Sequence, residues 1–262
     1  MERPTDLDKY EKWLKEERRC KFDGKVEERY ETVSLLVRSE FEQTGFWKCL
    51  KKELEESEAA YRLKTNGYSL LMIKPEELKL DIKGFDSFFL KTGRRNAFEN
   101  KNWPSEPDGG WVTPENWFSK INDIVRTVVV VKYLDGVELL AVKLKQICDS
   151  SGLTSKVDLE ASEEGYYAAH LYVEREYSIP TLEFDSEKVP IRVEIQITTQ
   201  LQEAINRITH KYYEERRRKV KSSDSKWQWD YESDEFIPNY LGHILHYIEG
   251  MIMEVRNREV KK

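Results

Sequence analysis

The sequence predicts an α+β fold: a mixed β-sheet of about five strands flanked by helices, with further helices at the N- and C-terminal ends. Two observations predict it. Apolar side chains have helical spacing over residues 7–62, and the centre of the chain alternates β-branched runs with helical stripes. On this pattern the 262 residues divide into an N-terminal helical flank (1–64), a core domain (65–220), and a linker with a C-terminal helix (221–262).

The N-terminal flank contains amphipathic stretches. In residues 26–43, apolar side chains recur every three or four positions, and a second stripe of the same kind starts at Phe46. Residues 51–58 mix both signs of charge, as is typical of a solvated helix face. We therefore expect helices here, followed by a short strand at 68–73 that Lys74-Pro75 would end.

The central segments carry the clearest strand signals. Residues 124–132 (IVRTVVVVK) form a nearly continuous β-branched run, typical of a buried strand. A helical stripe follows at 137–148, and residues 166–177 again have strand character. Residues 189–198 alternate, with valine and isoleucine on one face and polar side chains on the other. A further helical stripe at 201–212 completes the order strand, helix, strand, strand, helix, which predicts a mixed sheet with helices packed on it.

Composition excludes several classes of protein. Hydrophobic residues make up 39% of the chain and aromatic residues 12%, too many for a disordered chain. No apolar run approaches the roughly 18 residues that span a bilayer, and the N-terminus lacks the apolar stretch of a signal peptide. Cys20, Cys49 and Cys148 are unclustered, so a reducing cytoplasm without membrane contact is expected. The net charge of −6 argues against general nucleic-acid binding, but not against a local basic patch.

Several common catalytic motifs are absent from the sequence. There is no GxxxxGKS/T phosphate loop, no GxGxxG fingerprint, no cysteine pair at zinc-finger spacing, no His-Asp dipeptide and no GxSxG elbow. If the protein handles nucleotide phosphates, its side chains must therefore do much of the binding.

The polar face of the alternating strand is the most informative feature. Its side chains are Arg192, Glu194, Gln196 and Thr198. Asp123 lies at the start of the earlier β-branched run. A solvated sheet face would have a similar pattern, but two carboxylates that project from strands toward one cleft are also what Mg²⁺ needs. Magnesium prefers one or two carboxylates together with substrate phosphates and water, so Asp123 and Glu194 are candidate metal ligands.

Four segments occur in an order that resembles a known family. They are NDIVR at 122–126, GYYAAH at 165–170, VEIQI at 193–197 and ITHKYY at 208–213. The synthetase domain of RelA/SpoT proteins, which make the alarmone (p)ppGpp, carries similar elements in the same order. The resemblance covers roughly residues 85–215 and implies a nucleotidyltransferase-like version of the predicted fold. The segments IKPEELK, SFFLKTGRRN, INDIVRT and VVKYLDG are more similar to the toxic branch of small alarmone synthetases.

The resemblance implies a role for each matching residue. Asp123 and Glu194 would hold Mg²⁺, and Glu194 would also accept the proton of the attacking hydroxyl. The residues expected to bind ATP are Lys91, Arg94, Arg95 and Arg126. The residues expected to bind the acceptor are Tyr166, His170, Gln196, His210 and Tyr213, with Tyr166 stacked on its base. For His170 and His210, a purely structural role as hydrogen-bonded core histidines stays open.

The reaction that the resemblance implies is pyrophosphoryl transfer. A ribose 3′-hydroxyl attacks the β-phosphorus of ATP, the β- and γ-phosphates move together, and AMP leaves. Such chemistry depends on positioning and charge neutralisation rather than on covalent intermediates. The chain departs from the family pattern at Arg126, Ala168-Ala169, Thr198 and Thr209. These departures affect the acceptor site more than the ATP and metal site, so a changed acceptor is expected.

A basic segment at 207–221 favours an RNA acceptor. The candidate tRNA-binding residues are Arg216, Arg217, Arg218 and Lys219. The alternative is a solvated helix end, where cations are favoured. The long loop at 102–117 contains Trp103, Trp111 and Trp117, which either stack on unpaired bases or anchor the loop to the core.

The leading prediction is a toxic pyrophosphokinase that uses ATP to modify the 3′-CCA end of tRNA, inhibits translation, and has a cognate antitoxin protein as partner. The alternative is a synthetase acting on free GTP, GDP or adenine nucleotides. A third is a catalytically inactive module that senses a nucleotide or a partner protein. His243 and His246 lie on a helix expected at 239–256, without a carboxylate in view that would favour a metal site. That helix is core, an oligomer contact or an antitoxin surface.

Overall fold

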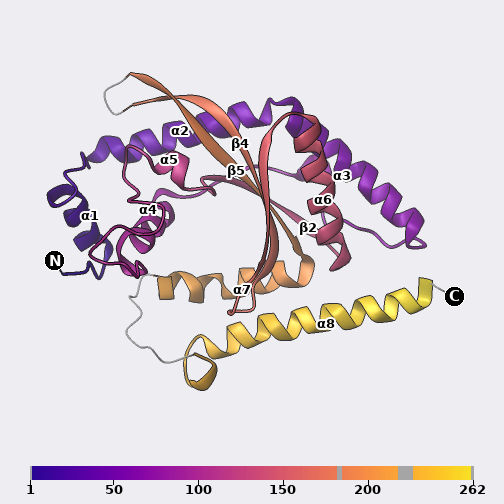
Figure 1. The fold of residues 1–262 in the computed structure, drawn as a ribbon. Coiled ribbons are helices and arrows are strands. Elements are labelled where there is room, and N and C mark those ends of the chain that lie inside the picture. Colours follow the sequence, from indigo (N-terminus) through magenta and orange to yellow (C-terminus); the bar gives the residue numbers. More distant parts are fainter. Residues whose placement is uncertain (1, 182–184, 218–226, 261–262) are drawn as a thin grey trace.

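The fold is known from a computed structural model of the chain. The structure describes residues 2–181, 185–217 and 227–260, with backbone only at 209–217 and 259–260. Five strands form one sheet in the order β1-β2-β5-β4-β3, and helices pack around it (Figure 1). The predicted α+β fold with a mixed sheet of about five strands is therefore confirmed.

The sheet is mixed because one of its central pairings is parallel. The strands are β1 (Asp81–Ile82), β2 (Val125–Val131), β3 (Thr154–Ala161), β4 (Tyr167–Pro180) and β5 (Ser186–Thr199). β2 and β5 run parallel, whereas the β1–β2, β5–β4 and β4–β3 pairs are antiparallel. After β2 the chain enters helix α6 (Asp135–Ser150), which packs on β3, β4 and β5. The acidic residues Asp135 and Glu138 in its first turn suit the positive end of the helix dipole.

Three helices cover the apolar face of the sheet: α2 (Gly24–Glu42), α3 (Gly45–Lys64) and α6. The first two begin at side chains that cap them. The Asp23 carboxylate accepts a hydrogen bond from the amide of Lys25, and the Thr44 hydroxyl accepts one from the amide of Trp47. Such caps satisfy amide groups that have no partner within the helix, and each contributes about 1 kcal/mol.

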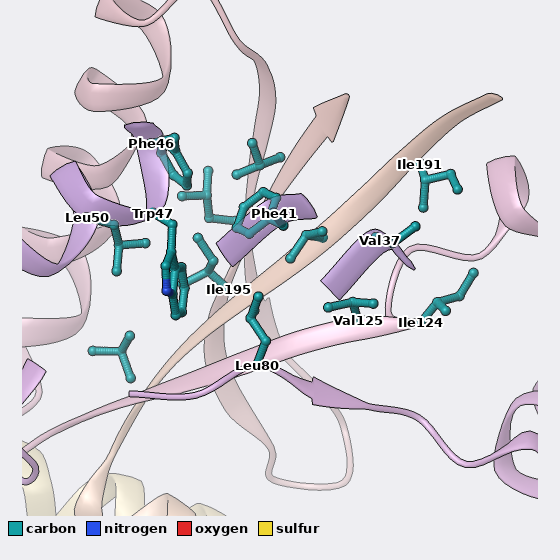
Figure 2. Packing of buried hydrophobic residues seen from close by; sticks show 14 of the residues in the cluster. Val37, Phe41, Phe46, Trp47, Leu50, Leu80, Ile124, Val125, Ile191 and Ile195 are labelled. Atoms are coloured by element: carbon teal, nitrogen blue, oxygen red, sulfur yellow. The ribbon is translucent and has the colours of Figure 1, made fainter. Parts of the chain in front are cut away.

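The main hydrophobic core lies between these helices and the sheet. Figure 2 shows Phe41 of α2 and Trp47 of α3 gathered with Val125 of β2 and Ile195 of β5. The odd-numbered residues of β5 from Ile191 to Ile197 are fully buried, as the alternating pattern predicts. Each large side chain removed from water in this way contributes roughly 1.5–3 kcal/mol. The core therefore fixes which face of β5 remains for polar residues.

The tryptophans of the long loop anchor it to the protein. Trp13 of α1 (Leu7–Glu16) has its ring centroid 5.4 Å from that of Trp103 and 4.9 Å from that of Trp111. Trp117 is only 1% exposed and lies in the main core. The described structure thus favours the anchoring role over base stacking for these three side chains. The remaining short helices here are η1 (Pro75–Glu77), α4 (Phe85–Gly93), the π-helical turn η2 (Arg94–Phe98) and α5 (Trp117–Lys120).

The predicted strands differ from the observed ones in three ways. Residues 68–73 do not form a strand; Leu71 makes a single antiparallel bridge to Val131, because the following turn leads the chain away. The edge strand β3 was not predicted, since it pairs on one side only and most of its side chains are exposed. An edge strand of this kind has no continuous apolar face that the sequence would reveal. β4 and β5 are also longer than predicted, because residues 178–180 of β4 continue the antiparallel pairing with residues 186–188 of β5.

The C-terminal part consists of α7 (Gln200–Arg217), the short turn η3 (Trp227–Trp229) and α8 (Phe236–Val260). α8 contacts α7 and lies along one edge of the molecule (Figure 1). The predicted helix at 239–256 is thus present and extends further at both ends. Within the described part of the chain, no helix has both the length and the apolar character needed to cross a membrane. The division of the chain at residues 64 and 220 stays a prediction.

Candidate active site

The polar face of the sheet, opposite α2, α3 and α6, brings the candidate residues together. Arg126 of β2 lies directly opposite Glu194 of β5, and Glu194 lies opposite Tyr172 of β4. One step along the sheet, Gln196 is the partner of His170. Because successive side chains of a strand point to opposite faces, these even-numbered residues share the face that the core leaves free.

Asp123 lies just before β2 and is held by two lysines. Its Oδ2 atom is 2.9 Å from Lys83 Nζ, and its Oδ1 atom is 2.8 Å from Lys91 Nζ. Burial by itself would raise the pKa of Asp123, which is 7% exposed, but the positive charges of Lys91 and Lys83 outweigh burial and lower the pKa well below its usual range. Asp123 is therefore a carboxylate whose two oxygen atoms both face ammonium groups.

The backbone positions Lys83 for this contact. Its amide donates to the carbonyl of Ile124 at 2.9 Å, and its carbonyl accepts a hydrogen bond from the buried Tyr30 hydroxyl at 2.6 Å. The Lys83 side chain is 11% exposed. Burial lowers the pKa of Lys83, and the Asp123 carboxylate opposes that effect. Both partners thus stabilise each other's charge in a largely dry site.

Glu194 forms a second charged cluster on β4 and β5. Glu194 is 6% exposed, and its Oε1 atom lies 2.6 Å from His170 Nδ1. On the other side of the imidazole, Nε2 is 3.2 Å from Glu160 Oε2 and 3.3 Å from the Tyr166 hydroxyl. Burial by itself would lower the pKa of His170, but the hydrogen bonds to Glu160 and Glu194 outweigh it and raise the pKa to about 9. At neutral pH, His170 is therefore an imidazolium between two carboxylates.

The two clusters lie within electrostatic reach of each other. After burial, the charges of Glu194 and Asp123 both contribute to a raised pKa of Tyr172. The pKa of Glu160 is lowered chiefly by its hydrogen bond to His170, and Lys91 adds to that effect. Asp123, with its lysines, and Glu194, with His170, therefore belong to one site.

Other predicted residues have different surroundings. Arg94 pairs with Glu99, with its Nε atom 2.8 Å from Glu99 Oε1, and Arg95 donates to the carbonyl of Lys120 at 2.9 Å. Neither arginine contacts Asp123 through a described interaction, so their assignment to ATP stays a prediction. The remaining candidates lie outside the residues whose side chains the structure describes: His210, Tyr213, Arg216, Arg217, Arg218 and Lys219.

Three residues of the site were not predicted. Lys83 directly follows the two-residue strand β1, whereas Lys91 lies on α4. Because the two lysines are on different elements, their spacing in the sequence does not indicate that they meet. Glu160 lies on β3, the edge strand that the sequence did not reveal. For Tyr172, by contrast, a signal was present: it lies two positions after His170 on a strand, so both side chains share a face.

The donor atoms of Asp123 and Glu194 are of the type that suits a magnesium ion. Asp123 and Glu194 offer hard carboxylate oxygens, the ligand type that Mg²⁺ prefers. Among the described residues, no group of three or more His, Cys, Asp or Glu side chains could hold a metal ion. His243 is engaged otherwise, because its Nδ1 atom is 2.9 Å from the Tyr167 hydroxyl and its Nε2 atom 3.0 Å from the carbonyl of Glu163. Two carboxylates complete a magnesium site only together with phosphate oxygens and water.

Comparison with known proteins identifies the fold. No protein-family model matches the chain, and no curated protein matches it either. Small alarmone synthetase 1 from Bacillus subtilis superposes with a TM-score of 0.52 at 16% identity, over 97% of this chain and 100% of that one. A GTP pyrophosphokinase family protein from Streptococcus pneumoniae superposes with a TM-score of 0.50, also at 16% identity, over 97% and 95% of the two chains. The chain thus has the fold of small alarmone synthetases.

Proposed function

We propose that the protein is a pyrophosphokinase that transfers the β,γ-pyrophosphate of ATP to a ribose 3′-hydroxyl. The observation that carries this proposal is the pairing of Asp123 with Lys83 and Lys91, beside the Glu194–His170 pair. Pyrophosphoryl transfer needs cations around the phosphates and carboxylates for a metal, and this site supplies both. The four sequence motifs and the fold of small alarmone synthetases support the same reaction.

In this proposal the lysines exchange partners when substrate binds. Lys83 and Lys91 leave the oxygens of Asp123 and bind the β- and γ-phosphates, where charge is spread in the transition state. Asp123 and Glu194 would be the residues that hold Mg²⁺, an ion that would supply neutralisation of phosphate charge. Because lysines occupy both oxygens of Asp123, this carboxylate would be free to hold a metal only after a nucleotide has drawn the lysines away.

Glu194 is placed to act on the acceptor. The described hydrogen bond to His170 engages Oε1, so Oε2 would accept the proton of the attacking hydroxyl. His170 holds the carboxylate in position through Nδ1, which makes it a positioning residue. Tyr166, whose hydroxyl lies 3.3 Å from His170 Nε2, would stack on the acceptor base. Gln196, the cross-strand neighbour of His170, would complete the acceptor contacts, whereas Arg126, the cross-strand neighbour of Glu194, would bind ATP.

For the acceptor we propose the 3′-CCA end of tRNA, so that the protein acts as a translation-inhibiting toxin, held in check by an antitoxin, in the cytoplasm. Support comes from the altered acceptor motifs, above all Thr198, and from the basic segment at 207–221. Thr198 is fully buried, and its hydroxyl donates to the carbonyl of Tyr167 at 3.3 Å. Its side chain therefore hydrogen-bonds within the sheet and supplies no positive charge that could bind the phosphates of a free nucleotide.

Labelled ATP tests both parts of the proposal. The protein is incubated with γ-labelled ATP and Mg²⁺, together with total tRNA, GTP, GDP or ADP in separate reactions. The proposal expects AMP release and label in tRNA that is lost when the 3′-terminal adenosine is removed. Label in a free nucleotide and none in tRNA would replace the acceptor but keep the reaction. No AMP with any acceptor would refute the enzyme and leave a sensing module.

A further inference from the structure

Glu160 belongs to the candidate active site but has no role in the proposed reaction. It lies on the edge strand β3, where it pairs with Ala168 of β4. Its Oε2 atom is 3.2 Å from Nε2 of His170, and its side chain is 48% exposed. Glu194, on the other side of the same imidazole, is buried. The two carboxylates that flank His170 therefore differ, because one is enclosed by the protein and the other borders solvent.

The Tyr166 ring and the Glu160 carboxylate are close neighbours. The Tyr166 hydroxyl is 3.3 Å from Nε2 of His170, the same nitrogen atom that Glu160 contacts. Burial raises the pKa of Tyr166, and the negative charge of Glu160 adds to that effect, as expected for groups in proximity. A planar group stacked on Tyr166 would thus have one of its edges beside Glu160.

The turn between β3 and β4 holds this arrangement in place. The amide of Ser162 donates to the carbonyl of Tyr166 at 2.9 Å, and the amide of Tyr166 donates to the Ser162 hydroxyl at 3.1 Å. Gly165 has a φ of +79°, and a Cβ atom there would lie 2.5 Å from the carbonyl oxygen of Asn239 on α8. Only glycine fits between the turn and α8. Tyr166 and Glu160 are therefore positioned before a ligand binds, which lowers the cost of ordering them.

The order of the strands determines which part of a nucleoside would reach Glu160. Glu194 of β5, His170 of β4 and Glu160 of β3 follow one another across the sheet. β5 and β3 are separated by one strand, that is by about 10 Å, a length that a nucleoside spans from its 3′-hydroxyl to the far edge of its base. With the 3′-hydroxyl at Glu194 and the base on Tyr166, the base edge remote from the ribose would face Glu160.

Glu160 has one oxygen atom available for that edge. Its Oε2 atom contacts His170, and among the residues that the structure describes no hydrogen bond or ion pair engages Oε1. A glutamate is ordinarily ionised at neutral pH, and the hydrogen bond to His170 lowers the pKa of Glu160 further. An ionised carboxylate only accepts hydrogen bonds. The base must therefore present a donor, such as the exocyclic amino group at N6 of adenine.

We propose that Glu160 is a specificity-determining residue whose Oε1 atom accepts a hydrogen bond from the exocyclic amino group of the acceptor base. The inference rests on the proposed function for the orientation of the acceptor, and the terminal adenosine of a 3′-CCA end carries this group. A base without a donor on that edge would remove water from the carboxylate and give it no partner in return. Free adenine nucleotides carry the same amino group, so the test includes both sources.

Replacing adenine by purine, which lacks only the amino group, tests the proposal by binding. Fluorescence anisotropy compares RNA minihelices that end in CCA or in CC-purine riboside, and calorimetry compares ADP with purine riboside 5′-diphosphate. A saturating non-hydrolysable ATP analogue fills the ATP side in every measurement. The full wild-type chain should bind the adenine minihelix roughly 10- to 100-fold more tightly than the purine one. Glu160→Gln should lower this ratio to about threefold or less, since an amide both accepts from adenine and donates to purine N1.

Asp158→Asn is the matched control, because it removes the same charge two positions away on β3 and should keep the wild-type ratio. A purely structural role of Glu160 would weaken both RNAs alike and leave the ratio unchanged.

A preference for adenine confined to the diphosphates would support the role of Glu160 with a free nucleotide as acceptor. Equal binding of adenine and purine by the wild type, no binding of either, or a ratio that survives Glu160→Gln in a variant with a normal thermal melt would overturn the proposal. The wild-type comparison decides the matter even where a variant does not fold. A Glu160-dependent preference without AMP release would keep this role and refute the proposed reaction.

Discussion

Lys91 Nζ and Asp123 Oδ1 lie 2.8 Å apart, and Lys83 occupies the other oxygen of the same carboxylate at 2.9 Å. A candidate metal ligand is thus neutralised by the side chains that are proposed to bind phosphate. In the proposed function, the substrate would break these ion pairs before Asp123 could bind a metal, and this coupling can be measured directly.

Manganese binding followed by electron paramagnetic resonance tests the coupling. We expect weak binding to the wild-type protein alone and at least tenfold tighter binding with a non-hydrolysable ATP analogue, since phosphates take the lysines from Asp123. Lys83→Met should strengthen binding of the metal alone, because it frees Oδ2. Lys79→Met, at an exposed position nearby, should change nothing. Equal binding with and without the analogue would contradict the exchange of partners.

Glu194→Gln should abolish pyrophosphoryl transfer and growth inhibition while leaving the fold intact. The amide oxygen still accepts the hydrogen bond from His170 Nδ1, but the side chain can no longer accept a proton or a metal charge. A loss of at least about 100-fold in kcat is expected for such a group. The measurement is AMP release beside a thermal melt. A toxic, active variant with a normal melt would refute the assigned role.

Tyr166→Ala should raise the KM for the acceptor by roughly 10- to 100-fold, the loss expected for one base–aromatic stack. The KM for ATP should not change, since the described contacts of Tyr166 are on the His170 side of the site. Tyr166→Phe is the matched control, because it keeps the ring and loses only the hydroxyl near His170. Equal effects of both changes would show that the hydroxyl, not stacking, matters.

Stability should fall between about pH 6.5 and pH 9 because of His170. Its pKa is raised to about 9 in the folded protein from its ordinary value of 6.5. A raised pKa means that the folded state binds the proton more tightly, so the stabilisation is complete below pH 6.5 and is lost as pH rises through 9. Urea unfolding of the wild type and of His170→Gln should show this decline in the wild type only. Parallel pH profiles would contradict it.

Two glycines of α8 should respond oppositely to alanine. Gly242→Ala places a Cβ atom against the backbone of Gly165, whereas a Cβ atom at Gly250 meets nothing within 4 Å. We expect Gly242→Ala to destabilise the protein by about 1–3 kcal/mol. Gly250→Ala should stabilise it by up to about 1 kcal/mol through helix propensity. Chemical denaturation gives both values, and a stabilising Gly242→Ala would show that α8 is not packed as described.

Local patterns in the sequence determined the centre of the sheet. The alternation over residues 189–198 predicted both the buried face of β5 and the polar face that carries Glu194, because a strand repeats every two residues. The helical stripes of the N-terminal flank likewise became α2 and α3, which share one core with the sheet. These features follow from the spacing of neighbouring residues and from the side of each element that must be removed from water.

Only the tertiary structure decided which charges meet. Lys83 reaches Asp123 across 40 positions of the chain, and Glu160 reaches His170 from an edge strand without an apolar pattern. α8 shows the same limit: its apolar residues predicted a helix, but not that Glu249 and Arg256 would face inward while Ile244 and Tyr247 face solvent. Strand register and helix docking set these contacts. Both depend on the summed burial of distant residues, which no local repeat in the sequence records.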